Sequence, residues 1–260
     1  MTFEQTVLLS ALAGLTIYLG LPIGRLRNLS TRTQAILTTA AAGVILFLIW
    51  DILAQAVEPV EAALEAATGG TGPASDFVTN VVAFAASIAI GLLSLVWLTQ
   101  RMKARRTEGI QPRDIAVGTA IGLGLHNLSE GLAIGQSAAT GETTFALILV
   151  IGFALHNATE GFGIAAPLTT GDRPTWGFLA ILGIIGGGPT FLGGVIGYSF
   201  VSPLASIVFL GLAAGALIFV FNEMMATSRK FAQPMAANVA LLVGLLVAFG
   251  TDFLLVALGA

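Results

Sequence analysis

Two short segments hold both histidines of the chain and two of its carboxylates in the same order. GLHNLSEGLAIG occupies residues 124–135, and ALHNATEGFGIA occupies residues 154–165. Both contain the pattern H-N-x-x-E-G, in which His and Glu stand at positions i and i+4 and share one face if the segment is helical. The repeated pattern predicts a site that combines imidazole, amide and carboxylate groups.

These groups are suited to a transition-metal ion. Imidazole nitrogen and carboxylate oxygen bind Zn²⁺, and Fe²⁺, Mn²⁺, Co²⁺, Ni²⁺ and Cd²⁺ accept them too, whereas Mg²⁺ and Ca²⁺ prefer shells of oxygen alone. Hydrogen bonding between helices without an ion is the structural alternative. Two copies that contain every histidine favour a metal site, and the candidate ligands are His126, Asn127, Glu130, His156, Asn157 and Glu160.

The elements that position these residues are membrane helices. The 260-residue chain is 56% hydrophobic and 10% charged, and its mean hydropathy of +0.92 exceeds the range of soluble domains. The absence of cysteine excludes thiolate metal sites and iron–sulfur clusters. A net charge of −3 is too small to suggest a nucleic-acid partner.

Eight apolar runs approach the length of about 17–25 residues that a helix needs to cross a bilayer. They are expected at Gln5–Ile23, Gln34–Ala56, Phe77–Gln100, Ile115–Ala138, Thr144–Leu168, Thr175–Ser199, Pro203–Thr227 and Pro234–Leu258. Glu4 precedes the first run and arginines follow it, the reverse of a signal peptide, so we expect this run to be retained. Residues 1–260 then form one all-α integral membrane domain.

The distribution of charge predicts the orientation in the membrane. All 11 Lys and Arg residues lie in the connections after the first, third, fifth and seventh runs. Because basic loops stay in the cytoplasm, both termini are expected outside. Acidic residues gather in the outer segments, where they would concentrate cations, although ordinary loop solvation explains them equally well; they are Glu4, Glu58, Glu61, Glu65, Asp76 and Glu142.

Some ionisable residues remain at membrane depth, and none of them is Lys or Arg. Their carboxylates must be neutralised by protons, by hydrogen bonds or by an external cation, and a bound metal ion does this most simply. A rise of ~1.5 Å per residue places both motifs near the midplane, on antiparallel neighbours that form an inverted pair. Asp51 and Asp252 fall in the outer third as an entrance, and Asn222 and Glu223 fall near the inner end of the seventh run as an exit.

With these motifs the sequence resembles the ZIP family of divalent metal transporters, and particularly its bacterial GufA-like branch, where H-N-x-P-E-G is followed by Q-N-x-P-E-G. The resemblance implies an eight-helix bundle with inverted repeats that carries Zn²⁺, Fe²⁺ and similar ions toward the cytoplasm. It implies that the six candidate ligands form the transport site. FNEMM, residues 221–225, resembles the acidic end of the family's seventh helix, which implies an exit role for Glu223.

The motifs depart from the GufA-like pattern at three positions. His156 replaces Gln, which strengthens nitrogen ligation and favours softer ions such as Zn²⁺. Ser129 and Thr159 replace the two prolines. We expect their hydroxyls to bond back to the carbonyls of Leu125 and Leu155 and to bend both helices gently.

The sixth run also departs from the family. No acidic residue occurs between Asp172 and Glu223, whereas some members bind a second metal with a carboxylate from this helix. We therefore expect one well-occupied ion, with Asn127 and Asn157 supporting at most a weak second one. The sequence GGGP at residues 186–189 predicts a flexible or broken helix segment that permits close packing or movement.

The main hypothesis is an importer of divalent metal ions, chiefly Zn²⁺, that works by alternating access. No segment matches G-x-x-x-x-G-K-[ST], so transport would follow an ion gradient, and protons would compete with the metal. Neither enzyme activity nor a resident cofactor is expected. The expected partners are the ion and the lipid bilayer, a homodimer is left open, and the expected location is a bacterial or archaeal inner membrane, as a multi-pass protein.

Three other functions are weighed against this one. A metal sensor or regulatory subunit would bind the ion without moving it. An intramembrane metalloprotease usually carries H-E-x-x-H with Glu as general base, and here Asn127 and Asn157 follow the histidines instead. A transporter of protons or monovalent cations would need no divalent metal.

Overall fold

The computed structural model describes residues 1–27, 29–105, 111–141, 143–170, 172–200, 202–229 and 233–258. The side chains of a few helical residues, His156 and Thr159 among them, lie outside this description. Within the described ranges the chain forms α-helices and short 3₁₀ segments and contains no strand. The all-α prediction is therefore confirmed.

The described α-helices are α1 (Phe3–Leu15), α2 (Thr31–Thr68), α3 (Ala74–Arg105), α4 (Pro112–Ala139), α5 (Thr143–Ala165), α6 (Trp176–Ser199), α7 (Pro203–Ser228) and α8 (Pro234–Leu258). The 3₁₀ segments η1 (Thr16–Leu19) and η2 (Leu21–Arg25) follow α1, and η3 (Ala166–Thr170) follows α5. Within the described chain, five helical stretches are long and apolar enough to cross a membrane: Phe3–Arg25, Thr31–Thr68, Ala74–Trp97, Trp176–Ser199 and Pro203–Ala226. They have the composition of a multi-pass membrane protein.

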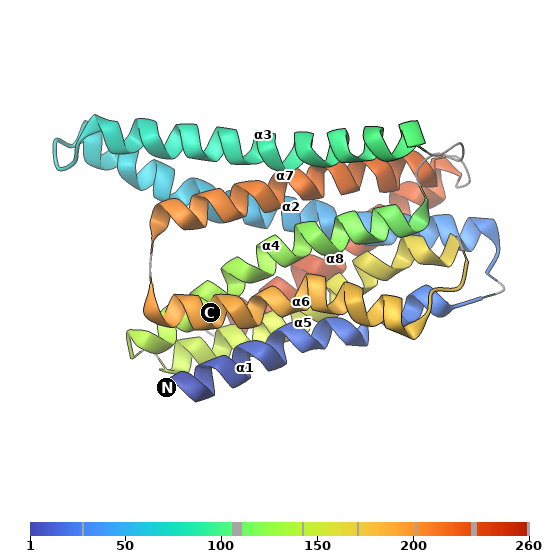
Figure 1. Ribbon diagram of the computed structural model, residues 1–260, viewed down its shortest axis with the longest axis horizontal. Coiled ribbons are helices and arrows are strands. Elements are labelled where there is room, and N and C mark those ends of the chain that lie inside the picture. Colours follow the sequence, from blue (N-terminus) through green and yellow to red (C-terminus); the bar gives the residue numbers. More distant parts are fainter. Residues whose placement is uncertain are drawn as a thin grey trace.

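The helices run back and forth along one axis, as Figure 1 shows. The N-terminus of α1, the end of α8 and the α2–α3, α4–α5 and α6–α7 connections lie toward the left end of the bundle in that view. The remaining connections lie at the opposite end, and the described arginines stand in them or in the adjoining helix ends. The described arginines therefore share one end of the bundle.

Local sequence chemistry explains where several helices begin. The side chain of Thr2 accepts a hydrogen bond from the backbone of Gln5, and Ser30 and Thr175 cap α2 and α6 in the same way. Proline stands at the first position of α4, α7 and α8, where the missing N–H costs no hydrogen bond. These signals reproduce the expected starts of α6, α7 and α8 to within a residue.

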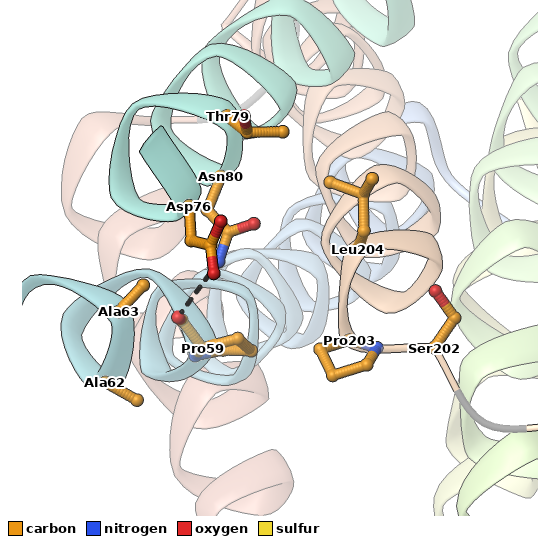
Figure 2. Close-up of a pocket in the computed structure, with 9 residues that line it drawn as sticks. All are labelled: Pro59, Ala62, Ala63, Asp76, Thr79, Asn80, Ser202, Pro203 and Leu204. Carbon is orange, nitrogen blue, oxygen red and sulfur yellow. Dashed lines mark hydrogen bonds between the residues drawn. The ribbon is translucent and has the colours of Figure 1, made fainter. Parts of the chain in front are cut away.

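Helix α2 is much longer than the sequence predicts. It continues to Thr68 instead of ending at Ala56, because Pro59 removes one backbone hydrogen bond without stopping the helix. The side chain of Asn80 on α3 donates to the carbonyl of Pro59 at 3.2 Å and joins the two helices. Figure 2 shows this contact beside an open cleft of about 510 Å³ between α2, α3 and the start of α7.

The first run is not one helix, contrary to expectation. Helix α1 ends at Leu15 and gives way to η1 and η2. The hydroxyl of Thr16 donates to the carbonyl of Ala13 at 2.7 Å, and Tyr18 donates to the carbonyl of Ala180 on α6 at 2.7 Å. A Cβ at Gly20 would clash with the α5 backbone, so the 3₁₀ turns carry the chain directly against α5.

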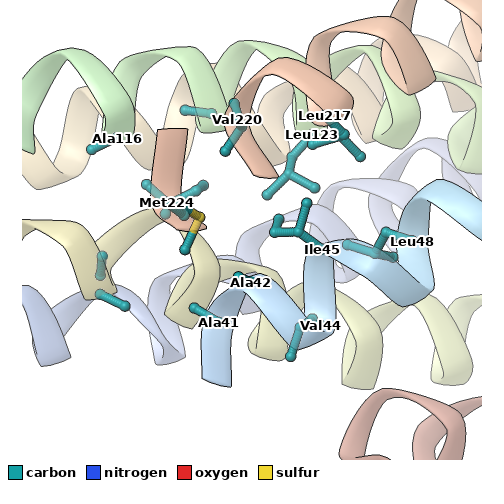
Figure 3. Close-up of a cluster of buried hydrophobic side chains, with 14 of the residues drawn as sticks. Ala41, Ala42, Val44, Ile45, Leu48, Ala116, Leu123, Leu217, Val220 and Met224 are labelled. Atoms are coloured by element: carbon teal, nitrogen blue, oxygen red, sulfur yellow. The ribbon is translucent and has the colours of Figure 1, made fainter. Parts of the chain in front are cut away.

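Packing divides the helices into two groups. Helices α1, α4, α5 and α6 pack around one another, with the most extensive contact between α4 and α6. Helices α2, α3, α7 and α8 form the second group through the α2–α8, α3–α7 and α2–α7 contacts. The groups meet mainly where α4 packs on α7, and there Figure 3 shows buried apolar side chains from α2, α4 and α7, including Ile45, Leu123 and Val220.

Glycine permits backbone contact at the crossings within each group. A Cβ at Gly14 of α1 would overlap the carbonyl of Gly187 of α6, and a Cβ at Gly187 would overlap the carbonyl of Gly14. These two glycines stand equally far from the start of their helices. Close approach of this kind lets membrane helices gain van der Waals contact where no hydrophobic effect drives them together.

The α2–α8 and α7–α3 crossings repeat this design. Gly43 and Gly244 each contact backbone of the other helix in the first crossing, and Gly215 and Gly91 do so in the second. Gly43 and Gly215 also stand equally far from the start of their helices. The α7–α3 crossing therefore resembles the α2–α8 crossing, and α7 takes the part that α2 plays there.

We predict that Gly187→Ala destabilises the protein by about 1–3 kcal/mol, because α1 and α6 must separate to admit the methyl group. Thermal unfolding in detergent measures the effect. Gly250→Ala on α8 is the matched control, because a Cβ there meets no neighbour within 4 Å and alanine raises helix propensity by up to ~1 kcal/mol. Equal melting temperatures for the two variants would contradict the prediction.

Candidate metal site

Helices α4 and α5 bring the two motifs together inside the first helix group. On α4, His126, Asn127 and Glu130 are buried, with exposed fractions of 2%, 0% and 4%. On α5, Asn157 and Glu160 are fully buried. The i and i+4 spacing places His126 and Glu130 on the same face of α4, toward α5. Burial of this many polar groups in a membrane helix pair requires that they satisfy one another or a ligand.

Three side chains converge closely enough to bind one ion. Nε2 of His126 lies 3.5 Å from Oε1 of Glu130 and 3.9 Å from Oε1 of Glu160. One ligand atom from each residue lies within 4.8 Å of the others. Ligand atoms bound to Zn²⁺ at about 2.0–2.2 Å stand roughly 3–4 Å apart, so only small movements would complete coordination.

The two asparagines connect the motifs to each other. Nδ2 of Asn127 donates to Oε2 of Glu160 at 2.7 Å, and Nδ2 of Asn157 donates to Oε2 of Glu130 at 3.4 Å. Each amide therefore holds the carboxylate of the opposite motif. The same nitrogens also donate to backbone carbonyls of other helices, Asn127 to Gly186 of α6 at 3.0 Å and Asn157 to Ala13 of α1 at 3.2 Å.

Ser129, between the ligands of the first motif, behaves differently from expectation. Oγ of Ser129 is buried and makes no hydrogen bond to any described group, so the expected bond to the carbonyl of Leu125 is wrong. Helix α4 stays regular through this position, where that carbonyl already has its helical partner. The side chains of His156 and Thr159 lie outside the described residues.

Helix α6 also differs from the prediction of a broken segment. It is continuous from Trp176 to Ser199 with Pro189 inside. Pro189 deprives only the carbonyl of Ile185 of its helical donor, and this carbonyl lies against Gly124 of α4. The prediction of close packing was right, because Gly187 is buried against α1 and Gly186 is buried against Ile17 of η1 and Ile164 of α5.

The predicted entrance residues lie near the cluster. Asp51 on α2 is half-buried and close enough to act electrostatically on His126 and Glu130. Asp252 on α8 is half-buried and interacts electrostatically with Asp51. The side chain of Gln55 donates to Oδ2 of Asp51 at 2.9 Å, a partner that sequence reasoning missed. The two acids therefore lie on helices that pack against each other.

The predicted exit residues stand apart from the cluster. Glu223 is half-buried and Asn222 is exposed near the end of α7, beside the buried Met224. Among the described side chains, the group that could hold a metal contains His126, Glu130 and Glu160 and no residue of α7. A role for Asn222 and Glu223 would therefore involve an ion after it leaves the cluster.

The site is chemically suited to a divalent cation. The cluster combines one imidazole with two carboxylates, and its described residues include no Lys or Arg. Two ionised carboxylates balance the charge of one divalent ion in a medium where an unpaired charge is costly. Imidazole nitrogen adds preference for borderline ions over Mg²⁺ and Ca²⁺.

A comparison with known families agrees with this chemistry. The family model described as ZIP Zinc transporter matches residues 98–252, a stretch that includes all of α4 to α7 and the whole cluster. No curated protein matches the chain at a significant level. The match does not distinguish branches, so the GufA-like resemblance stays a prediction. Because the match covers more than half of the chain, this protein belongs to the ZIP zinc transporter family.

Proposed function

We propose that this protein transports divalent transition-metal ions, with Zn²⁺ as the preferred cargo, through the site formed by His126, Glu130 and Glu160. The observation that carries the proposal is the convergence of these three buried side chains within 4.8 Å. His156 precedes Glu160 by one helical turn on α5 and is proposed as the fourth ligand, which would give the tetrahedral set that Zn²⁺ favours. One ion fills this site, because α6 offers no carboxylate beside it.

In the proposed topology the chain crosses the cell membrane eight times, and both termini lie on the outer side of that membrane. This topology is supported by the connections in Figure 1, because those in which or next to which the described arginines stand share one end of the bundle. The equal positions of Gly14 and Gly187, and of Gly43 and Gly215, support an inverted repeat of α1–α3 and α6–α8 around α4 and α5.

The proposed transport cycle is alternating access toward the cytoplasm. The cluster is at most 4% exposed at each described ligand, so an ion enters or leaves only after helices move. The boundary between the two helix groups is the natural plane of movement, because contacts across it are less extensive than those within the groups. Asp51 and Asp252 would deliver the ion, and Asn222 and Glu223 would receive it.

A metal sensor without flux is the alternative to transport. It would use the same cluster and would differ only in the absence of movement. An enzyme is a weaker fit, because both residues that follow the motif histidines are asparagines, which cannot act as general bases. Flux measurements therefore decide between the two proposals that use the metal site.

We predict that Glu130→Gln with Glu160→Gln abolishes Zn²⁺ uptake into proteoliposomes, because both anionic ligands become neutral. The loss should be at least about 100-fold, since removal of an outer hydrogen-bond partner alone costs roughly 10–100-fold in metal affinity. Glu65→Gln at the exposed end of α2 is the control. Unchanged uptake in the double variant would refute the site, and metal binding without flux in the wild type would favour the sensor.

We predict that Zn²⁺ uptake falls as pH is lowered from neutral, because imidazole and carboxylate ligands must lose their protons before they bind a metal. Uptake at subsaturating Zn²⁺ should fall more than uptake at saturating Zn²⁺, since protons compete with the ion for the ligands. Uptake assays at two Zn²⁺ concentrations across a pH series measure the difference. A pH effect of equal size at both concentrations would show that protons act elsewhere.

We predict that a cysteine in the α2–α3 turn reacts from outside the cell and one in the α5–α6 connection does not. The natural chain contains no cysteine, so Thr71→Cys and Asp172→Cys each provide one reactive thiol. A membrane-impermeant maleimide applied to intact cells should label the first variant alone and should label both after lysis. The reverse pattern would invert the proposed topology.

A further inference from the structure

The two motif asparagines make equivalent hydrogen bonds on the two sides of the cluster. Each donates to the glutamate of the opposite motif and to a backbone carbonyl of a neighbouring helix. Nδ2 of Asn127 bonds Glu160 and the Gly186 carbonyl of α6, and Nδ2 of Asn157 bonds Glu130 and the Ala13 carbonyl of α1. Ala13 precedes Gly14, and Gly186 precedes Gly187. Each amide thus ends beside one of the two glycines at which α1 and α6 touch.

The two carboxylates divide their oxygens in the same way. Oε1 of Glu130 and Oε1 of Glu160 face Nε2 of His126, at 3.5 and 3.9 Å. Oε2 of each glutamate is held by the asparagine of the opposite motif. An amide donor on one oxygen fixes the orientation of the carboxylate and leaves the other oxygen directed at the place where an ion would lie.

The geometry points to Asn127 and Asn157 as positioning residues that orient the two glutamates and tie them to α6 and α1, rather than as ligands of the ion in this conformation. The inference deepens the proposed function and rests on it where it concerns cargo. Both hydrogens of the Asn127 amide are engaged, and Oδ1 of Asn127 is buried with no hydrogen bond to a described group, so any rotation of this amide would break two bonds and leave the Gly186 carbonyl without this donor.

These hydrogen bonds couple ion binding to the crossing of α1 and α6. When an ion draws the glutamates inward, the asparagine amides that hold the glutamates also move. Their hydrogen bonds to the carbonyls beside Gly14 and Gly187 then change. A binding event shifts a conformational equilibrium only through such differential contacts. The α1–α6 pair is therefore the element that responds first when the site is loaded.

The hydrogen bonds of the two asparagines differ in strength. The bonds of Asn127 measure 2.7 and 3.0 Å, whereas those of Asn157 measure 3.4 and 3.2 Å. Shorter bonds to a carboxylate are the stronger ones. Loss of the Asn127 donor should consequently have the larger effect.

Substitution by aspartate separates a donor from a ligand. Asn127→Asp and Asn157→Asp keep the shape and the acceptor oxygens but remove the Nδ2 donors. We expect the Zn²⁺ affinity of the purified protein in detergent to fall by about 10-fold or more for Asn127→Asp and by less for Asn157→Asp. Asn238→Asp, at an exposed position of α8, is the control and should leave affinity unchanged. Affinity that is retained or increased in both motif variants would overturn the inference, because a cargo ligand improves when it becomes anionic.

Hydrogen exchange on the metal-free protein supplies a readout that does not depend on cargo. Loss of the Asn127 donor should speed exchange in α6 around residues 186–190, and loss of the Asn157 donor should speed exchange in α1 around residues 13–17. If the aspartate variants fail to fold, Asn127→Ala and Asn157→Ala serve the same comparison. Exchange that is unchanged in these segments, or changed equally in both helices by either variant, would overturn the inference.

The two levels of the proposal fail separately. A wild-type protein that neither binds nor transports Zn²⁺ would refute the proposed function, and the exchange pattern would then decide the role of the amides alone. If the wild type transports Zn²⁺ but the asparagine variants show the same hydrogen exchange as the wild type, the proposed function stands and the positioning role is refuted.

Discussion

Two buried carboxylates facing one imidazole are the constraint on which the rest of the molecule depends. Glu130, Glu160 and His126 are almost completely shielded from solvent, and the described cluster contains no Lys or Arg. Negative charge in such a place is stable only with a proton or a cation beside it. The same property that makes the site costly when empty makes it selective for a positively charged cargo.

The helices around the site are shaped by the need to bring backbone close to it. Backbone carbonyls of α1 and α6 can reach the motif amides only because glycines let these helices cross in contact. A larger residue at Gly14 or Gly187 would move the carbonyls of Ala13 and Gly186 away from Asn157 and Asn127. The glycine content of the chain therefore serves the polar site as well as the packing of the helices.

The convergence of His126, Glu130 and Glu160 follows from spacing in the sequence, because spacing decides which side chains share a helix face. His126 and Glu130 follow from their i and i+4 positions, and Glu160 follows from the repetition of the motif on an antiparallel neighbour. The partners on α1 and α6 could not be predicted, since a backbone carbonyl leaves no mark in the sequence. The length of α2 was missed because the apolar run ends at Ala56, whereas the helix continues through a polar stretch that Asn80 of α3 contacts at Pro59.

The proposed inverted repeat matches in position at Gly14 and Gly187 and at Gly43 and Gly215, but the matched helices α1 and α6 differ in structure. Thr16 and Pro189 stand equally far from the start of α1 and α6. At Thr16 helix α1 changes to 3₁₀ turns, whereas α6 continues through Pro189 to Ser199. Two identical halves would make the inward-facing and outward-facing states equivalent in energy. Because 3₁₀ turns have weaker hydrogen bonds than an α-helix, we expect the α1 side to be the easier one to reshape in the proposed transport cycle.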